Sequence, residues 1–197
     1  MPMRPYSSDN QSFNVLLQKE DVSCFVLNSD FVNPVLDLQE QIITVLTKAQ
    51  TPRYILRRTR TYIQTHLAPP HAILGVCQNN VLTAQMILHA PIPFDVQELG
   101  VSTLPHWQEN QRVCVLQGMI VAPQAQGQGL GRILLESAQI WCQREKIKHM
   151  AARVESSHSI SFNNFMREGF TCIETVQDPR DGAYVNVLYK MIASEEA

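Results

Sequence analysis

Hydrophobic positions change their spacing twice along the central part of the chain. Residues 113–123 read VCVLQGMIVAP, an apolar run rich in β-branched side chains that is typical of a buried strand. Residues 124–132, QAQGQGLGR, are polar and glycine-rich. From here onward apolar residues recur at helical intervals, at Leu130, Ile133, Leu134, Ala138 and Trp141. This order of patterns predicts a strand, a loop and a helix.

Further elements are predicted on the N-terminal side of this unit. They are a strand at 13–18, a helix at 31–48 with Asn33 and Pro34 as its start signal, and a second helix from Thr51 to His66. An antiparallel hairpin of strands 72–77 and 81–89 follows. Asn79 and Asn80 lie at the tip of the hairpin, where asparagine tolerates the left-handed backbone of a tight turn. Residues 90–110 are proline-rich and predict a long irregular loop.

The C-terminal part predicts a strand, a helix and a second hairpin. A buried strand covers 150–154, and the stretch Ser156, Ser157, His158 and Ser159 offers several caps for the helix that follows. Gly169 ends that helix. The hairpin consists of strands at 171–176 and 184–192, joined by the turn QDPRDG at 177–182.

Composition places the chain among globular proteins. Of its 197 residues, 45% are hydrophobic and 17% are charged, and no internal repeat or linker divides it. We expect a single domain over 12–197, preceded by a flexible arm over 1–11. The net charge of −2 gives no general electrostatic reason to bind nucleic acid or an anionic membrane. No apolar run is as long as the roughly 18 residues of a membrane span, and no signal-peptide core is visible, so we expect a cytoplasmic protein.

The five cysteines form no pair with metal-binding or redox spacing. They are Cys24, Cys77, Cys114, Cys142 and Cys172. Three of them lie in apolar strand-like runs and Cys142 lies in the central helix, which favours buried thiols in a reducing compartment over a disulfide framework or a metal site. We accordingly expect no bound metal.

The loop between the central strand and helix has the features of an anion site. Gly127, Gly129 and Gly131 let the backbone turn tightly and approach a ligand closely. The first turn of a helix presents unpaired N–H groups and the positive end of its dipole, which favours a phosphate. A Walker loop would need lysine and Ser/Thr where Arg132 and Ile133 stand, and a dinucleotide fingerprint would need glycine at Arg132. A turn that only packs the helix on the sheet is the alternative.

The hexapeptide QGQGLG at 126–131, after the strand that ends in Val-Ala-Pro at 121–123, resembles motif A of the GNAT superfamily of N-acetyltransferases. The order of elements over 72–192 is similar to that of the family. The resemblance implies an α/β (α+β) fold in which helices flank a twisted, mostly antiparallel mixed sheet of about six to seven strands. It also implies that acetyl-CoA binds as the cosubstrate, with its pyrophosphate on the loop.

The same resemblance assigns residues to the cofactor. The loop would bind the pyrophosphate with Arg132 as an additional cation, and the strand would separate from its neighbour near Gly118, leaving backbone groups for the pantetheine and the thioester. An asparagine that is common near His158 in the family is absent, although Asn163 and Asn164 follow. The expected cofactor-binding residues are Met119, Ile120, Val121, Gln126, Gly127, Gln128, Gly129, Leu130, Gly131, Arg132, His158 and Asn164.

Acetyl transfer to an amine also needs a base. A lysine-like ammonium with a pKa near 10.4 must lose its proton, which costs about 4–5 kcal/mol at pH 7. Glu155, at the end of the strand 150–154, is the candidate catalytic base, and a solvated or ion-paired carboxylate is the alternative. His106, His149 and His158 have suitable ordinary pKa values, but the sequence identifies no partner for them.

The usual general acid of the family is a tyrosine four residues before a Gly-Phe pair, and Phe165 stands at that position. Phenylalanine cannot protonate a departing thiolate. Because a thiol with a pKa near 8.5 leaves at a deficit of only about 2 kcal/mol at pH 7, Ser161, His158 and water are alternative donors. Loss of activity is the other interpretation.

Arginines gather on one face of the predicted second helix, at Arg53, Arg57, Arg58 and Arg60. A solvated face is one interpretation, and a site for an acidic acceptor or for the nucleotide end of the cofactor is the other. The loop at 90–110 directly precedes the central strand, so we expect it to line the acceptor pocket.

These features predict an enzyme, an acetyl-CoA-dependent N-acetyltransferase that acts on a primary amine of a small molecule or a protein. A non-catalytic acyl-CoA-binding or regulatory domain is the alternative. A nucleotide-binding protein of another type is disfavoured because the other phosphate motifs fail. A homodimer is compatible with the sequence.

Overall fold

A computed structural model describes residues 14–19, 22–50, 55–109 and 111–192, in which eight strands form one sheet. The strand order is β1-β2-β3-β4-β5-β6-β8-β7, and every neighbouring pair is antiparallel except β5 and β6. The strands are β1 (Asn14–Lys19), β2 (Val22–Val26), β3 (Ala72–Gln78), β4 (Val81–His89), β5 (Val113–Val121), β6 (His149–Glu155), β7 (Thr171–Gln177) and β8 (Tyr184–Met191).

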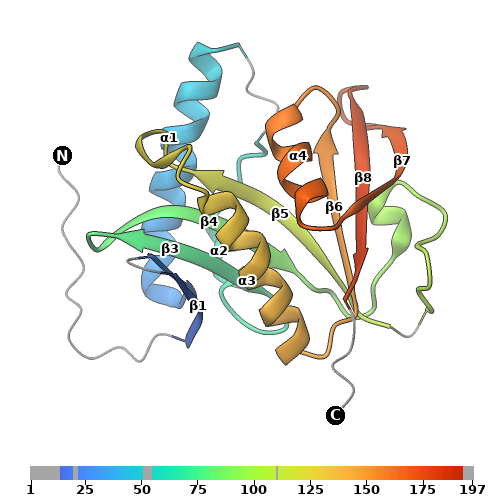
Figure 1. Ribbon diagram of the computed structural model, residues 1–197. Coiled ribbons are helices and arrows are strands. Elements are labelled where there is room, and N and C mark those ends of the chain that lie inside the picture. The colour runs from blue at the N-terminus through green and yellow to red at the C-terminus, as the bar shows by residue number, and fades with distance from the viewer. Residues whose placement is uncertain (1–13, 20–21, 51–54, 110, 193–197) are drawn as a thin grey trace.

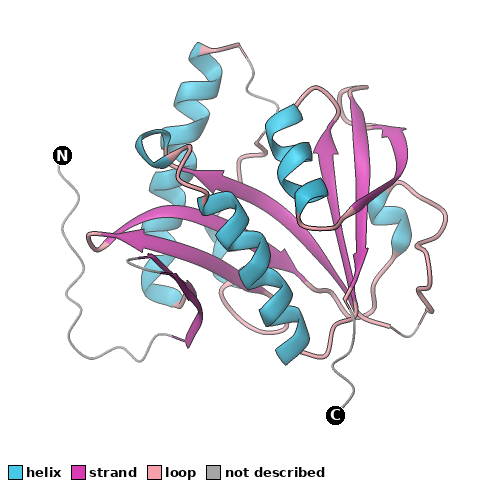
Figure 2. Cartoon of the chain, viewed as in Figure 1, coloured by secondary structure: helices cyan, strands magenta, loops and turns pink. Residues whose placement is uncertain are grey.

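Helices cover both faces of the sheet (Figures 1 and 2). In the view of Figure 1, α3 and α4 lie in front of the strands and α1 lies behind them. The α-helices of the described residues are α1 (Val32–Lys48), α2 (Arg60–His66), α3 (Leu130–Arg144) and α4 (Ser159–Arg167), and short 3-10 helices are η1 (Ser29–Phe31), η3 (Val96–Leu99) and η4 (Pro123–Ala125). No helix in these ranges is long and apolar enough to cross a membrane.

Two apolar clusters hold the layers together. The larger one joins the sheet to α1 through Val35 and Leu38, and to α3 through Leu134 and Ala138, all at most 1% exposed. The smaller one lies under the segment 94–104, whose side chains pack on β5, β6 and β8. The loop 90–110, which its proline content predicted to be irregular, is therefore held on the sheet by this cluster. It contains the 3-10 helix η3.

Most predicted elements are confirmed, including the mixed, mostly antiparallel sheet with flanking helices. The hairpin of β3 and β4 turns at Asn79 and Asn80, whose φ angles are 50° and 60°. Gly169, with φ of 80°, follows α4. The sheet has eight strands where about six to seven were expected, because β2, a short strand of five residues, was not predicted.

Two details of the prediction were wrong. The second helix begins at Arg60, where Thr59 caps it by accepting a hydrogen bond from the N–H of Tyr62 at 3.2 Å. The preceding backbone cannot be helical, since the N–H and C=O of Arg58 are both bound by the buried side chain of Gln39. The second detail is the side-chain cap of α4: the N-cap is His158, within the predicted stretch 156–159, but its side chain makes no capping hydrogen bond.

Several sequence predictions, among them Phe13 of the first strand and Arg53 of the arginine cluster, fall partly or wholly outside the described residues. The flexible arm over 1–11 and the proposed start of the second helix at Thr51 lie there entirely. The single domain over 12–197 stays a prediction.

Candidate active site

A bulge at Gly118 opens the sheet in the middle of β5. Ile87 pairs with Gln117 and Gln85 pairs with Ile120, so two residues of β5 lie opposite one residue of β4. Gly118 adopts a left-handed φ of 53°, a conformation that favours glycine. On the other side of β5, pairing with β6 ends at Leu116. From there on the two strands separate, as expected near Gly118, and the edge of β5 that faced β6 leaves the ladder.

The loop that follows β5 presents a row of backbone donors. Gly127 and Gly129 have φ angles of 80° and 75°, and a Cβ added at either position would meet nothing within 4 Å. Within the ranges that the structure describes, the N–H groups of residues 127–131 donate to no backbone carbonyl. These donors lie at the N-terminus of α3, where the helix dipole favours negative charge. The residues present therefore fit a phosphate-bearing group.

Several predicted cofactor-binding residues converge on this helix start. A Cβ added at Gly131 would lie 3.4 Å from Asn164 Nδ2 and 3.8 Å from Met119 Sδ. Leu130 and Ile120 are buried, at 1% and 2% exposure, and hold the loop to the core. Both are ordinary van der Waals distances, and they place α4 next to the loop.

The glutamines and the arginine of the loop are held by their own neighbours. Gln126 Nε2 donates to the carbonyl of Val121 at 3.4 Å, and Gln128 Oε1 accepts from Gln78 Nε2 at 2.9 Å. Arg132 Nε lies 3.0 Å from Glu136 and 2.9 Å from Glu168. In this arrangement the charge of Arg132 is engaged by two carboxylates, so its predicted role at the pyrophosphate would require the side chain to turn.

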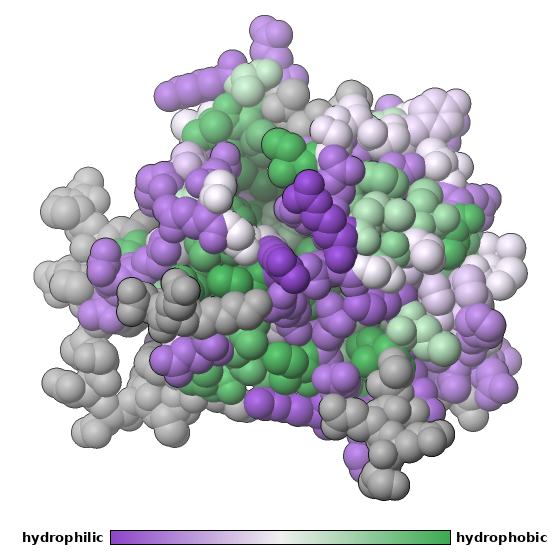
Figure 3. Space-filling model, in the orientation of Figure 1, coloured by the Kyte–Doolittle hydropathy of each residue, from purple (hydrophilic) through white to green (hydrophobic). Residues whose placement is uncertain are grey.

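A cavity of about 520 Å³ lies where β5 and β6 separate. Its lining comes from α2 and the segment before it, the end of β4, η3, β5, β6, β8 and the turn between β7 and β8, and includes Gly118. Among the described residues, the predicted cofactor loop does not line it. Figure 3 shows the face that carries α3 and α4, where a recess between α1 and α4 exposes hydrophobic surface. The cavity reaches the bulge through Gly118, and Met119, the next residue, lies beside the start of α3.

Glu155 lies in the lining of this cavity, at the end of β6 and opposite Val185 of β8. Ser157 donates a hydrogen bond from Oγ to Glu155 Oε1 at 2.6 Å. His158 follows at the start of α4. Its burial lowers its pKa, and the charge of Glu155 acts in the opposite direction.

The other predicted histidines have different surroundings. His149 is buried, with its ring nitrogens 2.9 Å from the hydroxyl of Tyr189 and 2.8 Å from Gln111 Oε1. It therefore holds neighbouring chain segments together. His106 has a left-handed φ of 58° and is exposed, and it is not among the described residues that line the cavity.

Phe165 is buried at 3% exposure, with its ring edge-on to Phe170 at a centroid distance of 5.0 Å. It packs within the larger apolar cluster. The position that carries the general acid in the resembled family therefore serves the core here, and a proton for a leaving thiolate must come from another group.

Opposite charges pair across the base of the cavity. Asp178, with a side-chain exposure of 4%, accepts hydrogen bonds from Arg180 at 2.6 Å and from Arg153 at 3.2 Å. The hydrogen bond from Arg180 is the main reason that the pKa of Asp178 lies well below its usual range. This group fixes the turn between β7 and β8 against β6.

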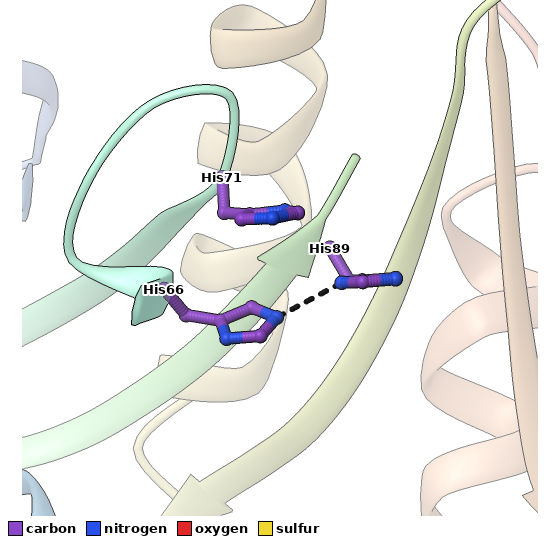
Figure 4. Close-up of side chains that lie close together, drawn as sticks. All are labelled: His66, His71 and His89. Carbon is purple, nitrogen blue, oxygen red and sulfur yellow. Dashed lines mark hydrogen bonds between the residues drawn. The ribbon is translucent and has the colours of Figure 1, made fainter. Parts of the chain in front are cut away.

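Three histidines lie beside the cavity (Figure 4). His66 Nδ1 lies 2.8 Å from the carbonyl of Tyr62, so it carries the proton and leaves Nε2 to accept from His89 Nδ1–H at 2.9 Å. His71 Nδ1 accepts from the N–H of Ala90 at 3.1 Å. Three neutral imidazole rings can make all of these hydrogen bonds. Burial, followed by the neighbouring histidines, lowers the pKa of His89 to about 4.

The ligand nitrogens of these histidines lie within 4.8 Å of one another, a spacing that a metal ion could bridge. The rings of His71 and His89 are parallel within 5°, with centroids 4.8 Å apart. A coordinated metal lies in the plane of each ligand ring, so one of these rings would have to rotate. The hydrogen bonds of the neutral rings already account for the cluster.

Comparison with known proteins points to one family. The model of the Acetyltransferase (GNAT) family matches residues 40–170. No curated protein sequence matches the chain. Solved structures match over most of its length at low identity, which shows a shared fold.

Three of these structures illustrate the match. A putative acetyltransferase, yncA, from Salmonella typhimurium, solved with acetyl-CoA, aligns with a TM-score of 0.67 at 16% identity over 90% of this chain and 98% of its own. A GNAT-family acetyltransferase from Streptococcus pneumoniae gives 0.66 at 13% identity over 87% and 99%. The ribosomal-protein-S18-alanine N-acetyltransferase from Escherichia coli gives 0.63 at 13% identity over 89% and 98%.

Several cavity residues were not predicted as site residues. Gln117, Tyr62 and the pair of Asp178 and Arg180 come from three segments far apart in the sequence, and none belongs to a motif. Arg58 was visible only as one member of an arginine cluster. The expectation that the loop 90–110 lines the cavity is met by Glu98 and Leu99.

The loop geometry predicts that Gly129→Asp weakens CoA binding at least about tenfold, because a carboxylate would stand beside the donors that hold the pyrophosphate. Gly129→Asn is the matched control, since asparagine has nearly the same size and tolerates the left-handed φ of 75° at this position. Isothermal titration calorimetry with CoA measures both variants. Equal affinities for the Asp and Asn variants would contradict the assignment of the loop.

The histidine cluster predicts an acid-labile fold. The pKa of His89 falls from about 6.5 in the unfolded chain to about 4 in the fold. Between these values the unfolded state binds more protons, so this stability is fully present above about pH 6.5 and is lost as the pH falls towards about 4. We expect His89 to contribute on the order of 3 kcal/mol to that loss.

Urea unfolding at several pH values tests this expectation. His89→Gln removes the titrating ring, so its free energy of unfolding should depend less steeply on pH over the same window than that of the unmodified chain. Parallel pH dependences for the two proteins would show that the protonation of His89 is not linked to folding.

Proposed function

The chain belongs to the GNAT acetyltransferase family, and we propose that it transfers the acetyl group of acetyl-CoA to a primary amine. The observation that carries this proposal is the meeting of two features at Gly118. The donor-lined loop at 127–131 leads into α3, where Gly131 lies beside Met119 of the bulge, and Gly118 lines a cavity large enough for a small acceptor. Cosubstrate and acceptor can then approach each other at the separation of β5 and β6.

Backbone groups do most of the binding of the cosubstrate. The N–H groups of residues 127–131 hold the pyrophosphate, each by a charge-assisted hydrogen bond that contributes about 1.5–3 kcal/mol. The edge of β5 beyond Leu116, which no longer pairs with β6, supplies donors for the thioester carbonyl. A donor aimed at developing negative charge is typically worth about two to three powers of ten in rate.

Glu155 removes the proton from the attacking amine. Its carboxylate lines the cavity at the end of β6 and accepts a hydrogen bond from Ser157, which restricts its orientation. An acceptor amine that enters the cavity meets this carboxylate beside the bulge, where the acetyl group would arrive. The role of base therefore requires no displacement of the strand.

The departing thiolate receives its proton from a group other than residue 165. Phe165 is enclosed by the core, and a thiol with a pKa near 8.5 needs only about 2 kcal/mol of assistance at pH 7. Water in the open cleft between β5 and β6 is the donor that requires no further side chain.

A second candidate function is binding of an acyl-CoA without catalysis. The observation that favours it is the burial of Phe165, which removes the usual acid of the family from the site. The two functions differ in whether a mixture of acetyl-CoA and amines yields acetylated product.

Glu155→Gln tests the proposed base. Glutamine keeps the size of the side chain and an oxygen to accept from Ser157, but it cannot take a proton. We expect kcat to fall by about two to four powers of ten near pH 7. The rate of the variant should also keep rising with pH until the acceptor amine itself deprotonates.

Ser157→Ala is the control, because it removes the hydrogen bond at 2.6 Å and keeps the carboxylate. It should retain most of the activity. Steady-state rates across pH at saturating acetyl-CoA provide the measurement. A Glu155→Gln variant with an unaltered rate and pH profile would make Glu155 a structural carboxylate.

A further inference from the structure

Arg58 stands out among the charged groups of the cavity. The cavity is lined by three arginines, Arg58, Arg153 and Arg180. Arg153 and Arg180 both bind Asp178. Within the described ranges no carboxylate lies within 4 Å of Arg58, whose guanidinium donates instead to the neutral oxygen of Gln117.

The position of Arg58 is fixed by contacts on three sides. Gln39, buried at 2% exposure, binds its backbone N–H at 2.7 Å and its backbone C=O at 3.0 Å. The guanidinium lies over the ring of Tyr62, 4.4 Å from the centroid. Its Nη2 donates to Gln117 Oε1 at 2.5 Å, and the hydroxyl of Tyr62 donates to the same oxygen at 2.8 Å. An arginine held in this way is pre-organised.

Among the residues that the structure describes, one nitrogen of this guanidinium makes a hydrogen bond. Arginine carries five N–H donors, and the bond to Gln117 uses one of them. No other hydrogen bond from this guanidinium is made within the described part of the chain, although it is half-buried. Burial is the main cause that lowers the pKa of Arg58, and the positive charge of Arg180 acts in the same direction. An anion bound here would offset both effects.

The remaining charges of the cavity have the opposite sign. Glu98, Glu155 and Asp181 line it as well. They would attract the ammonium form of an amine, while Arg58 would attract an anion. A neutral or purely cationic acceptor would leave the half-buried charge of Arg58 without a partner.

We propose that the acceptor of this acetyltransferase is an amine that also carries a carboxylate, and that Arg58 binds this carboxylate. The inference rests on the proposed function. Because Arg58 contacts Gln117, the residue directly before the bulge, the bound carboxylate lies close to the point where the acetyl group arrives. The nitrogen and the carboxylate are therefore only a few bonds apart, as in free amino acids.

The direct test compares acids with their amides as acceptors. The common L-amino acids and short ω-amino acids such as β-alanine are each assayed beside the corresponding carboxamide, with acetyl-CoA at saturation. For the preferred scaffold we expect the acid to exceed the amide in kcat/KM by about 10- to 100-fold, the usual range for hydrogen bonds to a charged group. This comparison uses the unmodified protein, so it does not depend on a variant that folds.

Arg58→Gln then locates the source of the preference. The variant should lose about 10- to 100-fold in kcat/KM for the acid, mainly through KM, and should change little for the amide. Arg57→Gln is the matched control, because Arg57 is exposed and paired with Glu40 at 3.0 Å. It should leave both substrates unaffected. Affinity for CoA and the unfolding temperature show that each variant is folded.

Two results would overturn the inference and leave the proposed function intact. One is equal kcat/KM for acids and amides in the unmodified protein. The other is an equal loss for acid and amide in Arg58→Gln, which would make Arg58 a support for Gln117 and the bulge. A protein that binds acetyl-CoA but acetylates no amine in the panel would overturn the proposed function itself, and with it this inference.

Discussion

The site depends on a single interruption of backbone pairing. β5 is hydrogen-bonded on both sides up to Leu116, and then a bulge at Gly118 disturbs its pairing with β4 while β6 turns away. A continuous ladder would satisfy these backbone groups and leave no opening between the strands. The interruption leaves backbone N–H and C=O groups of β5 without a strand partner, so a ligand can form hydrogen bonds with them. The surrounding apolar core is otherwise closely packed. The left-handed φ of Gly118 is the local condition for this geometry.

We propose that cosubstrate and acceptor reach the opening from two directions, and the two sides are built differently. On the side of α3, recognition relies on backbone donors and a helix dipole, which fit a phosphate whatever side chains surround it. On the side of α2, it relies on charged side chains held by other side chains, as Gln39 holds Arg58 and Arg180 holds Asp178. The first design suits a cosubstrate shared by a whole family.

The backbone geometry of the first side could be predicted from the sequence, whereas the residues that form the second side could not. The loop at 126–131 is contiguous, and its glycines have a local backbone requirement that can be recognised in a short motif. The acceptor side is assembled by long-range contacts, such as that between Arg58 and Gln117, which are 59 positions apart, and spacing in sequence carries no sign of them. The second helix was predicted to be too long because of another long-range contact. The side chain of Gln39 on α1 binds the backbone of Arg58, and this contact cannot be seen in the sequence. The strand β2 was missed because it is short and follows β1 closely.

The central claim is that cosubstrate and acceptor meet at Gly118 from opposite sides of the opening. A crystal structure with acetyl-CoA bound tests it most directly. The account predicts the pyrophosphate on the N–H groups of residues 127–131 and the acetyl group at the bulge, facing the cavity that contains Glu155 and Arg58. A cosubstrate whose pyrophosphate lies away from this loop, or whose acetyl group is separated from the cavity, would contradict it.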